Sequence, residues 1–265
     1  MLHERYNTYM KKNINKKVLA GSLGGLARFR KHGNFGTPEG RRLGGLRSLK
    51  THKLKPSGFI QLKKIIIPRR SSNLAELLGI LIGDGHLSRY QVLFTTNSDT
   101  DSEHAQYVSL LFNKLFSINT LIKKRKNKKA VDIIVSSANL VRYLNKLGMP
   151  IGNKLTIGLK VPLWIKRNRS FSRAFIRGLF DTDGCVFIDT HKYKDRTYRY
   201  LGWTFTSYDD KFLNEIKELL VNFGFNPTLT SKQRSVYLRK QSEIKEYFDL
   251  IGTSNLKHKS RFLRI

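Results

Sequence analysis

Cysteine is nearly absent from this chain of 265 residues, which contains a single one, Cys185. One cysteine excludes an internal disulfide framework and a thiolate zinc cluster, and it favours a reducing compartment. Long apolar runs are missing too, because no stretch approaches the run of about 18 residues that a transmembrane helix needs. The first residues also lack an apolar signal core. We therefore expect a soluble protein that is not secreted and that resides in the cytoplasm or inside an organelle.

Acidic residues are scarce as well. The sequence has 19 Asp and Glu against 50 Lys and Arg, which gives a net charge of +31. An excess of this size repels itself unless a polyanion supplies counter-charge, so we expect nucleic acid, and no membrane, as the partner. Hydrophobic residues still make up 40% of the chain, and this content excludes wholesale disorder.

Residues 1–70 form a basic extension, with 18 Lys or Arg and two acids. A phrase recurs within it, from Gly21 to Arg28 and from Gly40 to Arg47, and each copy contains a Gly-Gly step. Such steps let a backbone come close to a phosphate, and neighbouring arginines can pair with that phosphate. The arginines expected to bind the DNA backbone are Arg28, Arg41, Arg42 and Arg47. A flexible solubilising tail explains the charge equally well.

Beyond the extension the chain changes to stretches of apolar periodicity, and these occur twice. The matching pairs are Leu77–Gly85 with Ile176–Gly184, Phe94–Asp99 with Phe205–Asp210, and Leu140–Gly148 with Ile244–Gly252. Three matches in the same order, with small changes of spacing, indicate a duplicated domain. We expect a first repeat over residues 71–160 and a second repeat over residues 161–265.

Each repeat has the pattern helix, hairpin, helix, hairpin, helix, so we expect an α+β fold of two pseudo-symmetric αββαββα repeats. The expected helices span 73–83, 101–116 and 138–148, then 170–182, 209–223 and 241–251. The expected hairpins are 87–96 and 120–136, then 185–188 with 198–206 and 228–230 with 236–239. The first helix of each repeat carries small residues four apart, Gly79 and Gly83 or Gly178 and Thr182. Such stripes let two helix axes approach closely, so we expect these helices to pair on a pseudo-twofold axis.

Both of these helices end in Asp-Gly, with the acids at Asp84 and Asp183. The glycine suits a left-handed helix C-cap, and the symmetry brings both carboxylates together at the negative ends of the helix dipoles. Dipole and mutual repulsion oppose ionisation, whereas a divalent cation reverses this, and oxygen ligands suit Mg²⁺ or Mn²⁺. One Asp-Gly is an ordinary turn dipeptide. Two copies in matching contexts favour a metal site.

The duplicated helices resemble the motif of the LAGLIDADG homing endonucleases in their monomeric, two-repeat form, and the resemblance covers about residues 73–265. It implies that Asp84 and Asp183 are catalytic acids and metal ligands, and that backbone carbonyls of Gly83 and Thr182 also bind the metal. It further implies basic and polar groups around the scissile phosphates. The matching residues here are Lys154, Asn97 and either Lys257 or Lys259.

The resemblance also implies two saddle-shaped sheets that straddle a DNA duplex. Alternation supports this, because Val92 and Phe94, like Trp203 and Phe205, fall on the face opposite the polar side chains. The turns 123–129 and 231–234 are basic, although a solvated patch would look the same. The side chains expected to contact DNA are Gln91, Thr95, Asn97, Lys123, Lys124, Arg125, Lys126, Lys128, Lys129, Tyr200, Thr204, Thr206, Lys232, Arg234 and Arg239.

The sequence therefore predicts a monomeric, site-specific endonuclease that cuts both strands of double-stranded DNA across the minor groove with divalent metal ions. Two alternatives stay open. One is a non-cutting nucleic-acid binder on the same fold, either an intron maturase that binds intron RNA or a DNA-binding regulator. The other is a generic cationic RNA chaperone, which would not need two matched Asp-Gly helix ends.

Overall fold

The computed structural model describes residues 16–33, 36–54, 62–230 and 234–264. The chain divides into two compact units, Met1–Gln61 and Leu62–Ile265. This division falls before the end of the basic extension that the sequence indicates. Residues 63–68 lie on the first repeat, where Ile66 N donates to Phe116 O at 3.2 Å and the Tyr143 hydroxyl donates to Pro68 O at 3.0 Å.

The first unit contains two helices, α2 (Lys16–His32) and α3 (Pro38–Leu54). Both Gly-Gly steps of the repeated phrase lie inside these helices. The sequence pattern did not predict the helices, because glycine inside a helix costs up to about 1 kcal/mol relative to alanine. No residue of α3 is buried. Arg41 donates to Gly36 O at 2.7 Å and Arg42 pairs with Glu39 at 3.3 Å, while Arg28 and Arg47 lie exposed on the helix surfaces.

The second unit repeats the order αββαββα, which confirms the predicted fold class. Its first repeat comprises α4 (Ser72–Asp84), β1 (Gly85–Leu87), β2 (Gln91–Thr96), α5 (Ser102–Phe116), β3 (Leu121–Lys124), β4 (Val131–Ser136) and α6 (Ala138–Lys146). Two short helices follow, α7 (Lys154–Ile157) and α8 (Leu163–Lys166). The second repeat comprises α9 (Arg169–Asp183), β5 (Gly184–Tyr193), β6 (Arg196–Thr206), α10 (Asp210–Asn222), β7 (Thr228–Thr230), β8 (Ser235–Leu238) and α11 (Gln241–Leu250). A further helix that the sequence pattern did not indicate, α12 (Leu256–Phe262), closes the unit.

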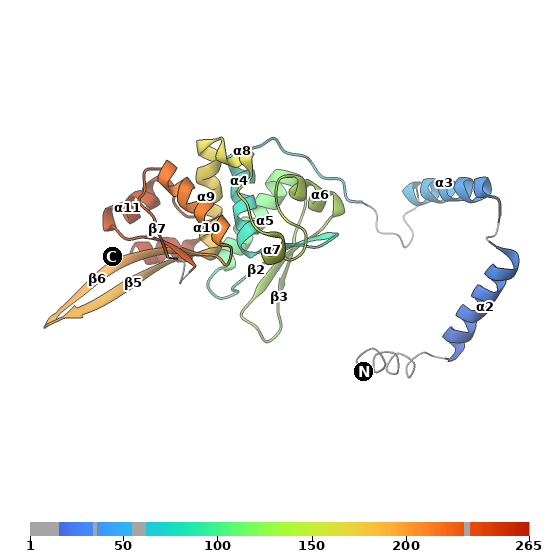
Figure 1. Ribbon diagram of the computed structural model, residues 1–265, viewed down its shortest axis with the longest axis horizontal. Helices are drawn as coiled ribbons and strands as arrows, with labels where there is room; N and C mark the ends of the chain where they lie inside the picture. The colour runs from blue at the N-terminus through green and yellow to red at the C-terminus, as the bar shows by residue number, and fades with distance from the viewer. Residues whose placement is uncertain (1–15, 34–35, 55–61, 231–233, 265) are drawn as a thin grey trace. The chain divides into compact units, whose positions relative to one another are not determined.

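Each repeat builds one four-stranded antiparallel sheet, of order β1-β2-β4-β3 or β5-β6-β8-β7. Figure 1 shows the hairpins of both sheets at the lower side of the unit, with α6, α8 and α11 above them. The four alternating residues predicted to face the core, Val92, Phe94, Trp203 and Phe205, are all buried. Among the described residues, no helix is long and apolar enough to cross a membrane.

Helices α4 and α9 pair at the centre of this unit. Ser71 caps α4 by accepting from Leu74 N at 3.3 Å, and Asn168 caps α9 by accepting from Phe171 N at 3.0 Å. Added Cβ atoms at Gly79 and Gly178 would lie 2.3 Å from Phe175 O and 2.2 Å from Glu76 O. The backbones therefore touch where the small residues lie, as the sequence predicts.

Candidate active site

The carboxyl ends of α4 and α9 meet, and they bring the two Asp-Gly pairs together. A Cβ atom added to Gly83 would lie 2.0 Å from Thr182 Oγ1 and 3.2 Å from Asp183 Oδ2. Thr182 Oγ1 in turn donates to Leu179 O at 2.8 Å. Asp183 of the second repeat thus lies against the residue that precedes Asp84 of the first repeat.

The glycines that follow the acids do not form left-handed caps, so that expectation is wrong. Gly85 has φ −85° and Gly184 has φ −86°, both extended conformations. The reason for glycine is space, because an added Cβ would lie 2.5 Å from Leu81 O at Gly85 and 2.4 Å from Phe180 O at Gly184. The chain turns from helix into strand too tightly for a side chain.

The surroundings oppose ionisation of both acids. Burial, followed by repulsion from Asp84, raises the pKa of Asp183 from 3.8 to about 7, against the attraction of Lys154. Burial also raises the pKa of Asp84, which is the more exposed of the two, while Lys154 and Lys257 partly offset the rise. The direction agrees with the sequence argument, although burial is a larger cause than the proximity of the two acids.

Lys154, at the start of α7, places its ammonium group at the carboxyl end of α4. Its Nζ donates to Ile82 O at 2.8 Å and also to Gly83 O, in a shorter contact. Burial lowers the pKa of Lys154, whereas Asp183 and Asp84 raise it less. A cation therefore already lies on the Gly83 carbonyl that the family resemblance assigns to the metal.

A cleft of about 1010 Å³ opens beside these groups. Its lining includes Gly83 and Lys154 from the first half of the unit and Asp183 and Arg234 from the second. His86 on β1 also lines it. Asp183 and the predicted lysine therefore face one concave, solvent-connected space, whereas Asp84 is not part of its lining.

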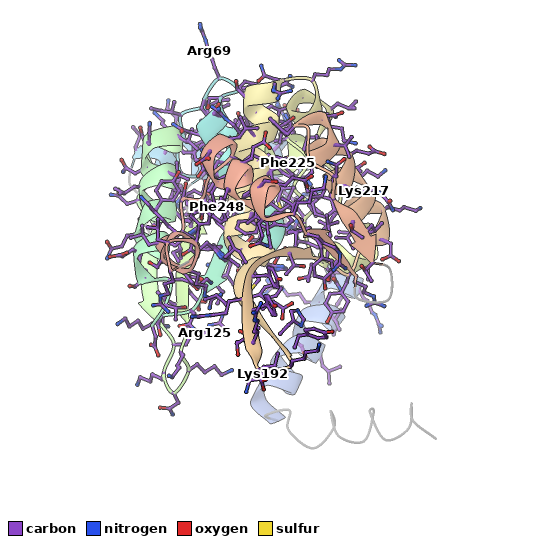
Figure 2. All side chains as sticks on the ribbon, turned by 90° about the vertical axis from the view of Figure 1, so that its left-hand side faces the viewer. Arg69, Arg125, Lys192, Lys217, Phe225 and Phe248 are labelled. Atoms are coloured by element: carbon purple, nitrogen blue, oxygen red, sulfur yellow. The ribbon has the colours of Figure 1, made fainter. Side chains whose placement is uncertain are left out.

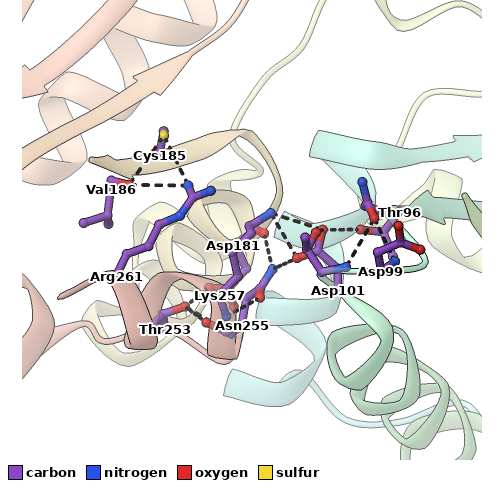
Figure 3. A network of polar contacts seen from close by, with 12 residues as sticks. Thr96, Asp99, Asp101, Asp181, Cys185, Val186, Thr253, Asn255, Lys257 and Arg261 are labelled. Carbon is purple, nitrogen blue, oxygen red and sulfur yellow. Dashed lines mark hydrogen bonds and ion pairs between the residues drawn. The ribbon is translucent and has the colours of Figure 1, made fainter. Parts of the chain in front are cut away.

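The structure separates the two candidate lysines of the second repeat. Lys257 Nζ lies 3.0 Å from a carboxylate oxygen of Asp101, a residue that is only 4% exposed (Figure 3). Burial raises the pKa of Asp101, but hydrogen bonds from Lys257 and Asn255 outweigh it and lower the pKa overall. Lys259 is exposed on α12, whereas the charge of Lys257 reaches Asp84.

Asn97 does not join this group. Its Oδ1 accepts hydrogen bonds from Asp99 N at 2.8 Å and Thr100 N at 3.2 Å, so the side chain shapes the loop before α5. It is also outside the lining of the cleft. Its proposed role beside the scissile phosphate has no geometric support in the described part of the chain.

A buried polar network next to the site was missed by sequence reasoning. Glu76, fully buried on α4, accepts from Tyr107 at 2.8 Å, from Ser254 at 2.6 Å and from Arg177 in a short ion pair. Asp181 accepts from Ser254 N at 2.9 Å, and burial raises its pKa to about 7. A charged residue inside an otherwise apolar helix is the one sequence signal that could have drawn attention to Glu76.

The side chains predicted to contact DNA have different surroundings in the two repeats. In the first repeat, Thr95 donates to Asp132 at 2.8 Å, and Arg125 Nε donates to both oxygens of the same carboxylate. Two side chains that were predicted to contact DNA are therefore hydrogen-bonded to Asp132. Gln91 bonds Ser136 at 3.2 Å. Lys129 pairs with Asp99 at 3.1 Å. All the basic residues of this hairpin are exposed: Lys123, Lys124, Arg125, Lys126, Lys128 and Lys129.

In the second repeat, Tyr200 and Thr206 are exposed on β6, and Thr204 is partly buried between them. Arg234 lies over the Tyr208 ring at 5.0 Å and Arg239 over the Tyr237 ring at 5.1 Å. Lys232 lies outside the described residues.

The family profile of the LAGLIDADG-like domain matches residues 71–148 and 170–258, one segment for each repeat. The chain belongs to this LAGLIDADG-like family. The match confirms the resemblance drawn from the two Asp-Gly helices, because each matched segment contains one of them.

Solved structures share the fold. I-SmaMI bound to an uncleaved DNA target in the presence of calcium ions has a TM-score of 0.51 and 11% identity, over 73% of this chain and 89% of that chain. I-DmoI in complex with DNA and Mn has a TM-score of 0.46 and 20% identity, over 69% of this chain and 97% of that chain.

Two curated relatives have other names. A tRNA-splicing ligase RtcB of Methanopyrus kandleri is 28% identical over 218 residues, which are 71% of this chain and 22% of that protein. A replication factor C small subunit of Methanocaldococcus jannaschii is 33% identical over 120 residues, 42% of this chain and 6% of that protein. The chain thus spans about a fifth of the length of the ligase relatives that it matches.

Proposed function

We propose that the protein is a site-specific endonuclease that hydrolyses both strands of double-stranded DNA with Mg²⁺ or Mn²⁺. The observation that carries the proposal is the junction of α4 and α9, where Asp183 lies against Gly83 and Lys154 acts on both Asp84 and Asp183. Family membership and the net charge of +31 support a nucleic-acid substrate.

The donor groups at this junction fit a hard divalent cation. The described residues contain no group of three or more His, Cys, Asp or Glu that could hold a metal ion. The candidate ligands are the two carboxylates and, as the family resemblance implies, the backbone carbonyls of Gly83 and Thr182, which together form an oxygen-only set. The carbonyls of Ile82 and Gly83 already accept from an ammonium group, so they face a cation.

Each residue then has a separate task. When bound, the ion supplies an activated water and neutralises the leaving oxygen. Asp84 and Asp183 hold the cation against DNA phosphates that would otherwise be repelled by the carboxylates. Lys154 and Lys257 add positive charge beside the phosphates, one anchored on backbone carbonyls and the other on Asp101.

The curated relatives have names that differ from one another. Segments of a tRNA-splicing ligase, a replication factor C subunit and a ribonucleoside-diphosphate reductase all match this chain. The match covers between 6% and 22% of those proteins. Because the match covers so small a share of each protein, we transfer none of these activities to this chain.

The experiment begins with selection of bound duplexes from a randomised DNA library in Ca²⁺, followed by transfer of the selected site to a supercoiled plasmid. With Mg²⁺, the wild type should give linear plasmid, and excess chelator should stop cutting while leaving binding largely intact. Asp84→Asn and Asp183→Asn should each bind the site but reduce cutting of both strands by orders of magnitude, because each removes a ligand of a shared site. Full linearisation by either variant would refute the assignment.

One observation favours the second candidate, a non-cutting nucleic-acid binder such as a maturase acting on intron RNA or a regulator. The Lys154 ammonium donates to the Gly83 carbonyl, so one of the candidate metal ligands already has a cationic partner. The plasmid assay separates the two candidates, because a binder would retain the selected site and leave the plasmid supercoiled with Mg²⁺ and with Mn²⁺.

A further inference from the structure

Strands β5 and β6 are much longer than their counterparts in the first repeat. They have 10 and 11 residues, against three in β1 and six in β2. Their antiparallel pairing continues to Tyr193 opposite Arg196. Every residue from 189 to 200 is exposed, and we call this segment the β5–β6 tip. Figure 1 shows it projecting beyond the rest of the unit, and Figure 2 labels Lys192 near its end.

Aromatic side chains of the tip share one face. In the pairing register, Tyr200 lies opposite Asp189 and Tyr198 opposite His191, so these four side chains share one face. By alternation along β6, this face continues into Thr204 and Thr206, the residues predicted to face DNA. Basic side chains outnumber acids along the tip, with Lys192, Lys194, Arg196 and Arg199 against Asp189 and Asp195.

The aromatic rings of the first face are arranged as a stack. The Tyr198 and Tyr200 rings are parallel to within 5°, with centroids 6.5 Å apart. The His191 ring lies 6.2 Å from Tyr200 on the neighbouring strand. Tyr198 is 38% exposed and Tyr200 is 44% exposed, so neither ring is used by the core. Successive bases in a nucleic-acid strand are about 3.4 Å apart, and the ring spacing is close to twice that distance.

We propose that the β5–β6 tip binds a single-stranded polynucleotide by stacking unpaired bases on Tyr198 and Tyr200. This interaction goes beyond cutting of a duplex, because paired bases expose only their edges in the grooves, whereas aromatic rings need the base faces. The excess of cations favours a polyanion over an apolar protein partner. Tyrosine rings supply the stacking, and the neighbouring Lys and Arg contact the phosphates.

The test compares two oligonucleotides of equal charge, an oligothymidine of about ten nucleotides and an abasic strand of the same length. The full chain is titrated with each one at fixed salt, and the ratio of the two affinities cancels the phosphate contacts of the basic extension. The wild type should bind the oligothymidine at least about fivefold more tightly than the abasic strand. Tyr198→Ala with Tyr200→Ala should bring the ratio close to one, whereas the Tyr198→Phe and Tyr200→Phe pair should retain it.

The matched control is Arg199→Ala, on the opposite face of the same strand. This variant should lower the affinity for both oligonucleotides by the same factor and make that affinity less dependent on salt, while the ratio of the two affinities stays unchanged. If circular dichroism shows that the alanine variant loses structure, the double variant Tyr198→Val with Tyr200→Val takes its place, because valine is favoured in strands. Oligouridine should behave like oligothymidine, because stacking uses base faces and no sugar hydroxyl.

A base preference that survives removal of both rings would overturn the proposal, as would an equal loss of affinity for the two oligonucleotides. These affinities are measured without cleavage. Failure of the nuclease assignment and failure of the stacking proposal are therefore separate results.

Discussion

Replacing Asp183 by Asn should stabilise the metal-free protein at neutral and alkaline pH, although it removes a candidate metal ligand. Burial and then Asp84 raise the pKa of Asp183 to about 7 in the folded protein. A carboxyl group with a raised folded pKa contributes stability that is fully present below its unfolded pKa and is lost as pH rises through the folded pKa. Ionised Asp183 therefore opposes folding above about pH 7, and asparagine carries no such charge.

The magnitude follows from the shift. At about 1.36 kcal/mol per pKa unit, a change from 3.8 to about 7 corresponds to about 4 kcal/mol. Water in the cleft screens part of this energy. We therefore expect Asp183→Asn to raise the free energy of unfolding by about 1–3 kcal/mol at pH 8 and to change it little at pH 4.

The assay is urea unfolding at pH 4, 6 and 8 in excess chelator, repeated at pH 8 with Mg²⁺. Mg²⁺ should stabilise the wild type through binding to the native state and should stabilise the variant much less. Asp99→Asn is the matched control, because a hydrogen bond from Lys129 lowers the pKa of this exposed carboxyl and its loss should give no stabilisation at pH 8. A stability difference between wild type and Asp183→Asn that does not grow from pH 4 to pH 8 would refute the reasoning.

Three other perturbations test separate parts of the structure. Gly178→Ala should lower the free energy of unfolding by about 3 kcal/mol, since its Cβ would lie 2.2 Å from Glu76 O. Gly45→Ala, with nothing within 4 Å of the added Cβ, should not lower it. Glu76→Gln should lower the free energy of unfolding by about 3 kcal/mol in urea unfolding, because the partly buried Arg177 loses its charged partner, the fully buried Glu76. Removing residues 1–57 should flatten the slope of log affinity against log salt concentration and leave the base preference unchanged, because the extension is expected to contact phosphates. A lost base preference with an unchanged slope would mean that the extension contacts bases instead.

Local patterns in the sequence were sufficient to predict the architecture and the neighbouring positions of Asp84 and Asp183. Apolar periodicity with small residues four apart predicted that α4 and α9 would touch at Gly79 and Gly178, and the backbones do touch there. Each of those helices ends in its own acid, so the symmetry that pairs the helices also brings Asp84 and Asp183 together. These features repeat within each half of the chain and are therefore visible without tertiary information.

Other features were decided only by the tertiary structure. Ser254 bonds Glu76 across 178 residues of sequence, and Lys257 forms an ion pair with Asp101 that no spacing rule encodes. Gly85 has an extended φ, and an added Cβ would lie 2.5 Å from Leu81 O, whereas the preference for glycine at helix C-termini favoured a left-handed cap. Periodicity reports which face of an element is apolar. It does not report which distant polar group meets that element, because such contacts form only after the apolar faces have packed.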